Sequence, residues 1–132
     1  MKGYINDIEQ ATLHNENFRQ VLYTTKLSQL VVMSIEPGQK IGEEVHDVDQ
    51  FLRIEAGEGC AILDGLKHGL ADGFSITVPA GTRHNVINTG SQALKLYTVY
   101  SPPNHKDGLI HKTKADAEAG EADDHWDGST SE

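Results

Sequence analysis

Short runs rich in β-branched and aromatic residues follow one another along the middle of the chain, and each has the length of a strand. The first two runs cover residues 18–24 and 29–35, and Glu36-Pro37-Gly38 ends the second as a turn. Further runs cover residues 51–55, 60–63, 66–70, 75–78, 84–87 and 93–100. Short strands at this spacing, separated by Gly and Pro, predict an antiparallel sandwich or barrel, so the expected fold class is all-β.

Local signals refine this outline at a few places. Asp64-Gly65 separates two of the runs and predicts a hairpin with a two-residue turn. Helical patterns are confined to residues 8–15 and 113–122, outside the expected β body. We therefore expect one small β domain with short helical additions at its two ends.

Composition and charge narrow the choice of partners and compartment. The chain has 132 residues, which suits one domain, and its single cysteine, Cys60, allows no internal disulfide. A net charge of -9 argues against nucleic acids and anionic membranes as partners. No long apolar run or secretory signal is visible, so we expect a cytoplasmic protein without a membrane span. Seven carboxylates and one lysine in residues 114–132 predict partial disorder in this tail.

Two blocks of glycine, proline and polar residues carry the most specific signal. The first block contains Gly38, Glu44, His46, Gln50 and Gly57, and the second contains Gly73, Pro79, Gly81, His84 and Asn88. In these residues and their spacing the chain resembles the cupin superfamily. The resemblance implies a jelly-roll β-barrel over residues 27–103. Residues 1–26 would then add a helix and a strand, packed on the barrel or on a dimer partner, and residues 104–132 would form a C-terminal extension.

The resemblance also implies a metal site inside the barrel, with Glu44, His46, Gln50 and His84 as ligands. Glu44 stands where cupins commonly have His, and Gln50 stands where they commonly have Glu, so the site keeps one carboxylate. Because alternate strand residues share a face, Glu44, His46 and Gln50 can all project inwards. Two imidazoles, a carboxylate and an amide oxygen suit one divalent ion, with Zn preferred and Fe(II), Mn or Ni possible.

The same resemblance suggests what such a site would do. The chain is similar to small mannose-6-phosphate isomerase-like cupins, which implies an isomerase acting at the metal on a small polar molecule. Glu44, His46 and His84 are also the ligand types of non-haem Fe(II) dioxygenases, which is an alternative reading. A non-catalytic module that binds a metal or small ligand is the third.

Residues outside the ligand set give weaker hypotheses. Arg53 could meet an anionic group of the substrate, and Tyr97 or Tyr100 could donate a hydrogen bond, although these two tyrosines lie on opposite faces of one strand. No residue outside the ligand set stands out as a general base. Trp126, in the polar tail, suggests that the tail docks on its own barrel or on a partner. A homodimer is expected, because residues 18–24 could close a neighbour's sheet edge.

Overall fold

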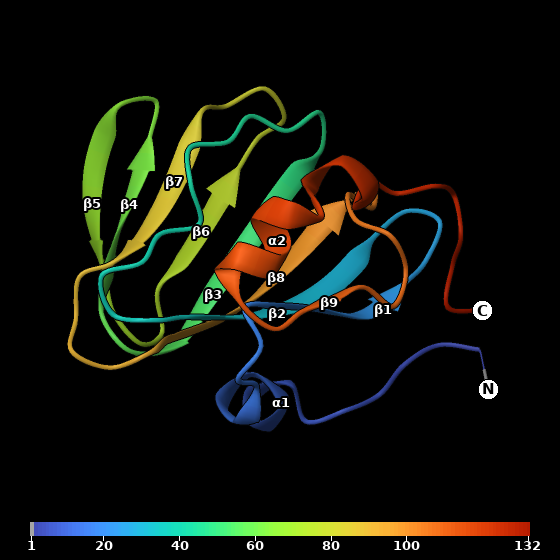
Figure 1. Cartoon of the computed structure of the whole chain (residues 1–132), viewed down its shortest axis with the longest axis horizontal. Helices are drawn as coiled ribbons and strands as arrows, with labels where there is room; N and C mark the ends of the chain where they lie inside the picture. The colour runs from blue at the N-terminus through green and yellow to red at the C-terminus, as the bar shows by residue number, and fades with distance from the viewer. Residues whose placement is uncertain (1) are drawn as a thin grey trace.

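The computed structural model describes residues 2–132 and consists of two antiparallel sheets facing each other, which confirms the all-β fold class (Figure 1). The elements are α1 (Ile8–His14), β1 (Arg19–Thr24), β2 (Gln29–Ile35), β3 (Asp49–Ala56), β4 (Gly59–Leu63), β5 (Leu66–Leu70), β6 (Ser75–Val78), β7 (His84–Asn88), β8 (Leu94–Ser101), β9 (Ile110–His111), α2 (Lys114–Ala119) and the 3₁₀ helix η1 (Glu121–Asp123). Among residues 2–132, no helix is both long and apolar enough to cross a membrane.

The larger sheet has six strands in the order β6-β3-β8-β2-β1-β9. Strands β3 and β8 alternate between buried and more exposed residues, as expected when one face of a sheet covers a core, whereas β2 is buried along almost its whole length. On β3, Gln50, Leu52 and Ile54 point inwards, and β8 pairs with β3 so that Gln50 lies opposite Tyr100. Gln50 is therefore a polar residue in the interior. It lies at the end of the barrel that holds the polar cluster described below.

The smaller sheet has three strands in the order β5-β4-β7. The turn between β4 and β5 is the expected Asp64-Gly65 pair, and both residues have positive φ angles, 49° and 80°. Such angles are the reason that Asp-Gly favours two-residue hairpins. The core between the sheets is aliphatic, and Val31, Leu52 and Leu96 are fully buried in it. Burying each of these side chains contributes about 1.5–3 kcal/mol.

The N-terminal helix packs on the larger sheet. Asp7 caps α1 by accepting a hydrogen bond from the backbone N–H of Gln10, and the helix contacts β8, β3 and β2. The following strand, β1, joins the larger sheet beside β2. Association with a second copy stays a prediction.

The C-terminal segment, residues 104–132, contains β9, α2 and η1, and the partial disorder expected from its composition stays a prediction. β9 pairs with β1, and α2 begins with a capping box between Thr113 and Asp116. Ala117 is buried against the core, and the backbone N–H of Trp126 donates to the carbonyl of Asn104. In Figure 1 the segment, drawn from orange to red, runs in front of β8 and β1. Local caps and burial of a few side chains hold it despite its acidic composition.

Candidate metal centre

Glu44, His46 and His84 form the one cluster of potential metal ligands in residues 2–132. One ligand atom from each lies within 4.8 Å of the others. A β-bridge joins the two blocks: the N–H of Glu44 donates to the carbonyl of His84, and the N–H of His84 donates to the carbonyl of Glu44, both at 2.9 Å. The backbone itself therefore places these two side chains next to each other.

Hydrogen bonds orient the two imidazoles. Nδ1 of His84 lies 2.9 Å from the carbonyl oxygen of Thr82, so Nδ1–H donates and Nε2 keeps its lone pair. Nε2 of His46 is buried without a hydrogen-bond partner among the described residues, and it lies 3.5 Å from Oε2 of Glu44. A nitrogen with a free lone pair facing a carboxylate is the arrangement that a divalent cation would complete.

Gln50 is buried on the inner face of β3, and its amide is oriented by Thr98. Its Nε2 donates to the hydroxyl of Thr98 at 3.1 Å, which leaves Oε1 buried without a partner in the part of the chain that the structure describes. An unpaired buried carbonyl oxygen costs about 1–3 kcal/mol. The ring of Tyr100, which lies opposite Gln50 on β8, contacts the ring of His46 edge-on with centroids 5.9 Å apart. Two imidazoles, a carboxylate and an amide oxygen are donor groups that suit a divalent metal ion.

Burial changes the pKa values of two of these groups in opposite directions. It raises the pKa of Glu44, because the charged carboxylate is desolvated. Burial, followed by the neighbouring His84, lowers the pKa of His46 to about 4. His46 is therefore neutral near pH 7, the protonation state in which imidazole binds a metal.

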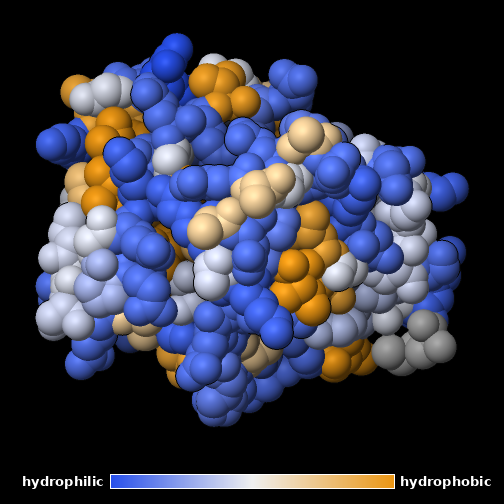
Figure 2. Space-filling model, in the orientation of Figure 1, coloured by the Kyte–Doolittle hydropathy of each residue, from blue (hydrophilic) through white to orange (hydrophobic). Residues whose placement is uncertain are grey.

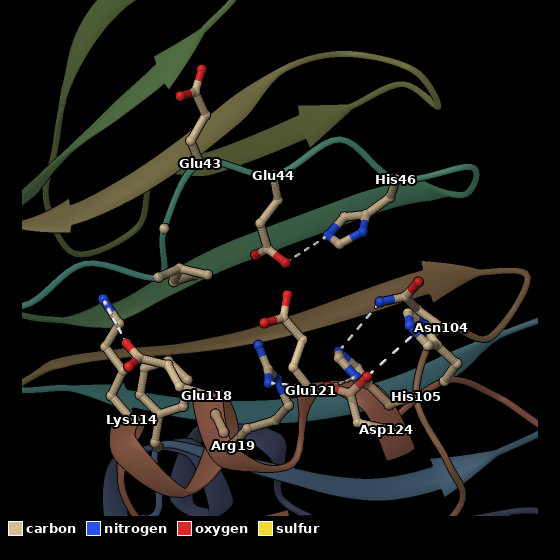
Figure 3. A pocket seen from close by; sticks show the side chains of 15 residues that line it. Arg19, Glu43, Glu44, His46, Asn104, His105, Lys114, Glu118, Glu121 and Asp124 are labelled. Atoms are coloured by element: carbon tan, nitrogen blue, oxygen red, sulfur yellow. Dashed lines mark hydrogen bonds and ion pairs between the residues drawn. The ribbon is translucent and has the colours of Figure 1, made fainter.

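The cluster lies at one wall of a pocket of about 250 Å³. Glu44 and His46 line this wall, and the opposite wall comes from β1 and the C-terminal segment. Figure 3 shows this second wall, with Arg19, His105 and Asp124 across the pocket from Glu44 and His46. Hydrophilic residues dominate this face of the molecule around α2 (Figure 2). The pocket is suited to a small polar ligand.

A buried glutamine fixes His105 at the second wall. Oε1 of Gln29 accepts from the N–H of His105 at 2.9 Å, and Nε2 of Gln29 donates to the carbonyl of His105 at 2.7 Å. The imidazole of His105 lies between two polar groups, with Nε2 3.4 Å from the Tyr100 hydroxyl and Nδ1 3.7 Å from Oδ2 of Asp124. Burial lowers the pKa of His105. A neutral imidazole therefore stands in the pocket that Glu44 and His46 line.

A family model described as a cupin domain matches residues 31–100. The chain belongs to the cupin family. This cupin is 49% identical over 127 residues to the uncharacterized protein YrkC of Bacillus subtilis (strain 168), a match that covers 91% of this chain and 68% of YrkC. A Bacillus halodurans crystal structure is 42% identical, with a TM-score of 0.88, and the match covers 89% of this chain and 95% of that one.

Remoter cupins share the fold alone. A structure from Thermotoga maritima described as a predicted oxalate decarboxylase is 24% identical, with a TM-score of 0.56 over 59% of this chain and 69% of that one. At this level of identity the likeness carries no statement about chemistry. The cupin match ends at residue 100, before His105 and Asp124, and begins after Arg19.

The structure separates the three residues that the sequence suggested for substrate binding. Tyr100 is buried and faces the interior beside His46. Tyr97 and Arg53 lie on the outer face of the larger sheet, where Tyr97 packs against Phe51 and Nε of Arg53 lies 3.5 Å from Oε1 of Glu55. Strand alternation makes this placement unavoidable, because Arg53 is an odd number of residues from Gln50. Neither residue reaches the pocket.

Sequence reasoning missed Arg19, His105 and Asp124. Arg19 is buried on β1, on the same face as Val21. The two-residue spacing between them is visible in the sequence, but it does not indicate which face of the strand points to the interior. His105 and Asp124 both fall in the expected C-terminal extension, residues 104–132, and neither was proposed for the site. Only the pairing of β9 with β1 and the clamp by Gln29 bring them to the pocket.

Proposed function

We propose that this cupin holds one divalent metal ion with Glu44, His46, Gln50 and His84, and that it acts there on a small polar molecule as an isomerase-like enzyme. The observation that carries the proposal is the Glu44–His46–His84 cluster, in which Nε2 of His46 is buried without a partner; Oε1 of Gln50, on the inner face of β3, is also buried without a partner in residues 2–132. Zn is the preferred ion for this donor set, and Fe(II), Mn and Ni suit it as well.

The open pocket supports a site that binds a ligand over a purely structural metal site. Structural metal ions are enclosed by protein ligands, whereas a catalytic ion keeps a position for water or substrate. Glu44 and His46 both line the pocket, so a small molecule in it would lie against their side chains. An ion bound there would supply Lewis-acid chemistry, which polarises a carbonyl or hydroxyl oxygen.

His105 supplies the proton acceptor that the sequence did not reveal. Its ring lines the same pocket, and its lowered pKa keeps it neutral and able to accept a proton near pH 7. Asp124 faces Nδ1 and would stabilise the imidazolium that forms. In the isomerisation of a hydroxy carbonyl compound, His105 would remove the proton from the hydroxyl-bearing carbon and return it to the neighbouring carbonyl carbon, while the hydroxyl proton would move to the former carbonyl oxygen.

A dioxygenase is the second candidate, because two histidines and one carboxylate form the cluster. This set is the one that non-haem Fe(II) oxygenases use. Oxygen uptake by Fe(II)-loaded protein in the presence of a bound small molecule would favour the dioxygenase. Turnover with Zn and without oxygen would favour the isomerase-like reaction.

Metal analysis tests the proposal directly. We expect about one ion per chain in protein loaded with Zn, Fe(II), Mn or Ni, measured by inductively coupled plasma mass spectrometry. The E44A and H84A variants should bind Zn at least about 100-fold more weakly than the wild type. This loss of affinity is larger than the loss expected when a residue that only hydrogen-bonds to a metal ligand is removed. H68Q, at an exposed histidine of β5, is the matched control and should bind as the wild type does. Absence of stoichiometric metal under every loading condition would refute the metal site.

A further inference from the structure

Arg19 is a buried cation that faces the pocket from the wall opposite the metal ligands. It is 6% exposed, it stands at the start of β1, and its side chain points to the interior as that of Val21 does. Figure 3 shows its guanidinium across the pocket from Glu44 and His46. The fold has placed a strongly hydrated group where little water reaches it.

The guanidinium lacks the hydrogen bonds that such a group requires. Its Nε is buried without a partner among residues 2–132. Its nearest ion-pair contact joins Nη1 to Oδ2 of Asp124 at 4.0 Å, which is longer than a hydrogen bond. Leaving buried N–H groups of a charged side chain unpaired is costly, so the site is suited to an added oxygen acceptor.

The charges around Arg19 select the kind of acceptor. Glu43, Glu44, Glu118, Glu121 and Asp124 line the pocket, and the cations on it are Arg19 and Lys114. A doubly charged phosphate would meet excess negative charge there, even beside a divalent ion. A carboxylate carries one charge on two coplanar oxygens, which match the fork of a guanidinium.

We propose that Arg19 anchors the carboxylate of a small hydroxy or oxo acid, whose hydroxyl or carbonyl oxygen is directed at the Glu44–His46–His84 cluster. The metal-facing end of this ligand rests on the proposed function, whereas the carboxylate end rests on Arg19 alone. The pocket of about 250 Å³ has room for a ligand of this kind. Arg19 lies outside residues 31–100, so the general cupin match does not supply this subsite.

Lactate and lactamide provide a matched pair of probes, because they differ in the carboxylate and share the hydroxyl. By calorimetry on Zn-loaded protein, we expect lactate to bind more tightly than lactamide. R19Q should weaken lactate binding by about 10- to 100-fold, the value of charge-assisted hydrogen bonds, and should leave lactamide nearly unchanged. R19K keeps the positive charge but lacks the planar pair of N–H donors, so its affinity for lactate should lie between those of the wild type and R19Q. R53Q, at an arginine on the outer face of the same sheet, is the control and should behave as the wild type.

A variant that should bind lactate more tightly distinguishes a specific effect of Arg19 from a folding defect. D124N removes a negative charge beside Arg19 and should tighten lactate binding by about two- to five-fold. General damage to the pocket would weaken binding in both D124N and R19Q. If R19Q does not fold, R19K and D124N carry the test.

The outcomes separate this proposal from the metal proposal. Equal affinity for lactate and lactamide in the wild type would overturn it, as would lactate binding that R19Q and R19K leave unchanged. Zn content should be the same in R19Q and the wild type, because Arg19 is not a ligand. If the wild type binds no metal, the proposed function fails; a preference of that metal-free protein for lactate, lost in R19Q, would still support Arg19 as the anchor.

Discussion

The pocket has two walls of different origin. Glu44 and His46 stand on one wall with His84 clustered beside them, and all three come from the part of the chain that the cupin model matches. Arg19, His105 and Asp124 stand on the other, and all three lie outside the matched residues. The first wall offers metal-binding atoms without partners, whereas the second offers a cation, an imidazole and a carboxylate for contacts with a ligand.

The two walls differ in their position relative to the cupin match, which covers residues 31–100. The matches at 49% and 42% identity cover 91% and 89% of the chain, so they extend beyond residues 31–100. Under the proposed function, the wall with Glu44 and His46, here called the barrel wall, would hold the metal ion, and the second wall would contact the ligand.

The two buried glutamines, Gln29 and Gln50, can each be replaced by leucine. The two variants perturb the second wall and the barrel wall separately. Gln29 is fully paired: it bonds the backbone of Asn104 and His105 and the hydroxyl of Thr24. Q29L would leave several of these buried groups unpaired and should lower the free energy of unfolding by about 4 kcal/mol. Urea denaturation of the metal-free protein measures this loss.

Zn binding to folded Q29L should stay close to that of the wild type, because the barrel wall does not depend on Gln29. A loss of Zn affinity as large as that expected for H84A would show that the two walls are one cooperative unit, and the comparison would then fail.

The pH dependence of stability is the second largest expected effect. The ordinary pKa of histidine is 6.5, and that of His46 is about 4 in the folded chain. Between these values the unfolded chain holds more protons, so the free energy of unfolding should rise with pH, by up to about 3 kcal/mol for His46. The lowered pKa values of His105 and His111 act in the same direction. The raised pKa of Glu44 opposes them above pH 4.5.

Thermal unfolding of metal-free protein from pH 4 to pH 7 would measure this slope. H46N should reduce the dependence of stability on pH, because it removes the histidine that titrates on the barrel wall. H105N should remove the contribution of the histidine on the second wall. A slope that neither variant changes would mean that the titrating groups lie elsewhere.

The smallest effect is expected for Q50L. Oε1 of Gln50 has no partner to lose, so the metal-free variant should match the wild type in stability within about 1 kcal/mol. Its Zn affinity should fall by about tenfold or more if the amide oxygen is the fourth ligand. The reverse pattern, a clear loss of stability with unchanged Zn affinity, would make Gln50 a structural residue like Gln29.

Much of the barrel wall could be read from the sequence. The strands, the Asp64-Gly65 turn and the cluster of Glu44, His46 and His84 depend on spacings of a few residues, which local geometry converts into faces and turns. The second wall could not be read in this way. The sequence suggested Arg53 for an anionic group and did not single out Arg19, because alternation alone does not say which face of a strand is inside.

The sequence by itself determined the all-β cupin barrel and the residues able to bind a metal, since both follow from short-range patterns and motif spacing. Only the tertiary structure decided that Arg19, His105 and Asp124 meet across a pocket from those residues. They are far apart in the chain, and they are brought together by the place of β1 beside β9 at the sheet edge and by the Gln29 clamp. Contacts of this kind depend on which strands pair, and no local pattern of residues specifies that pairing.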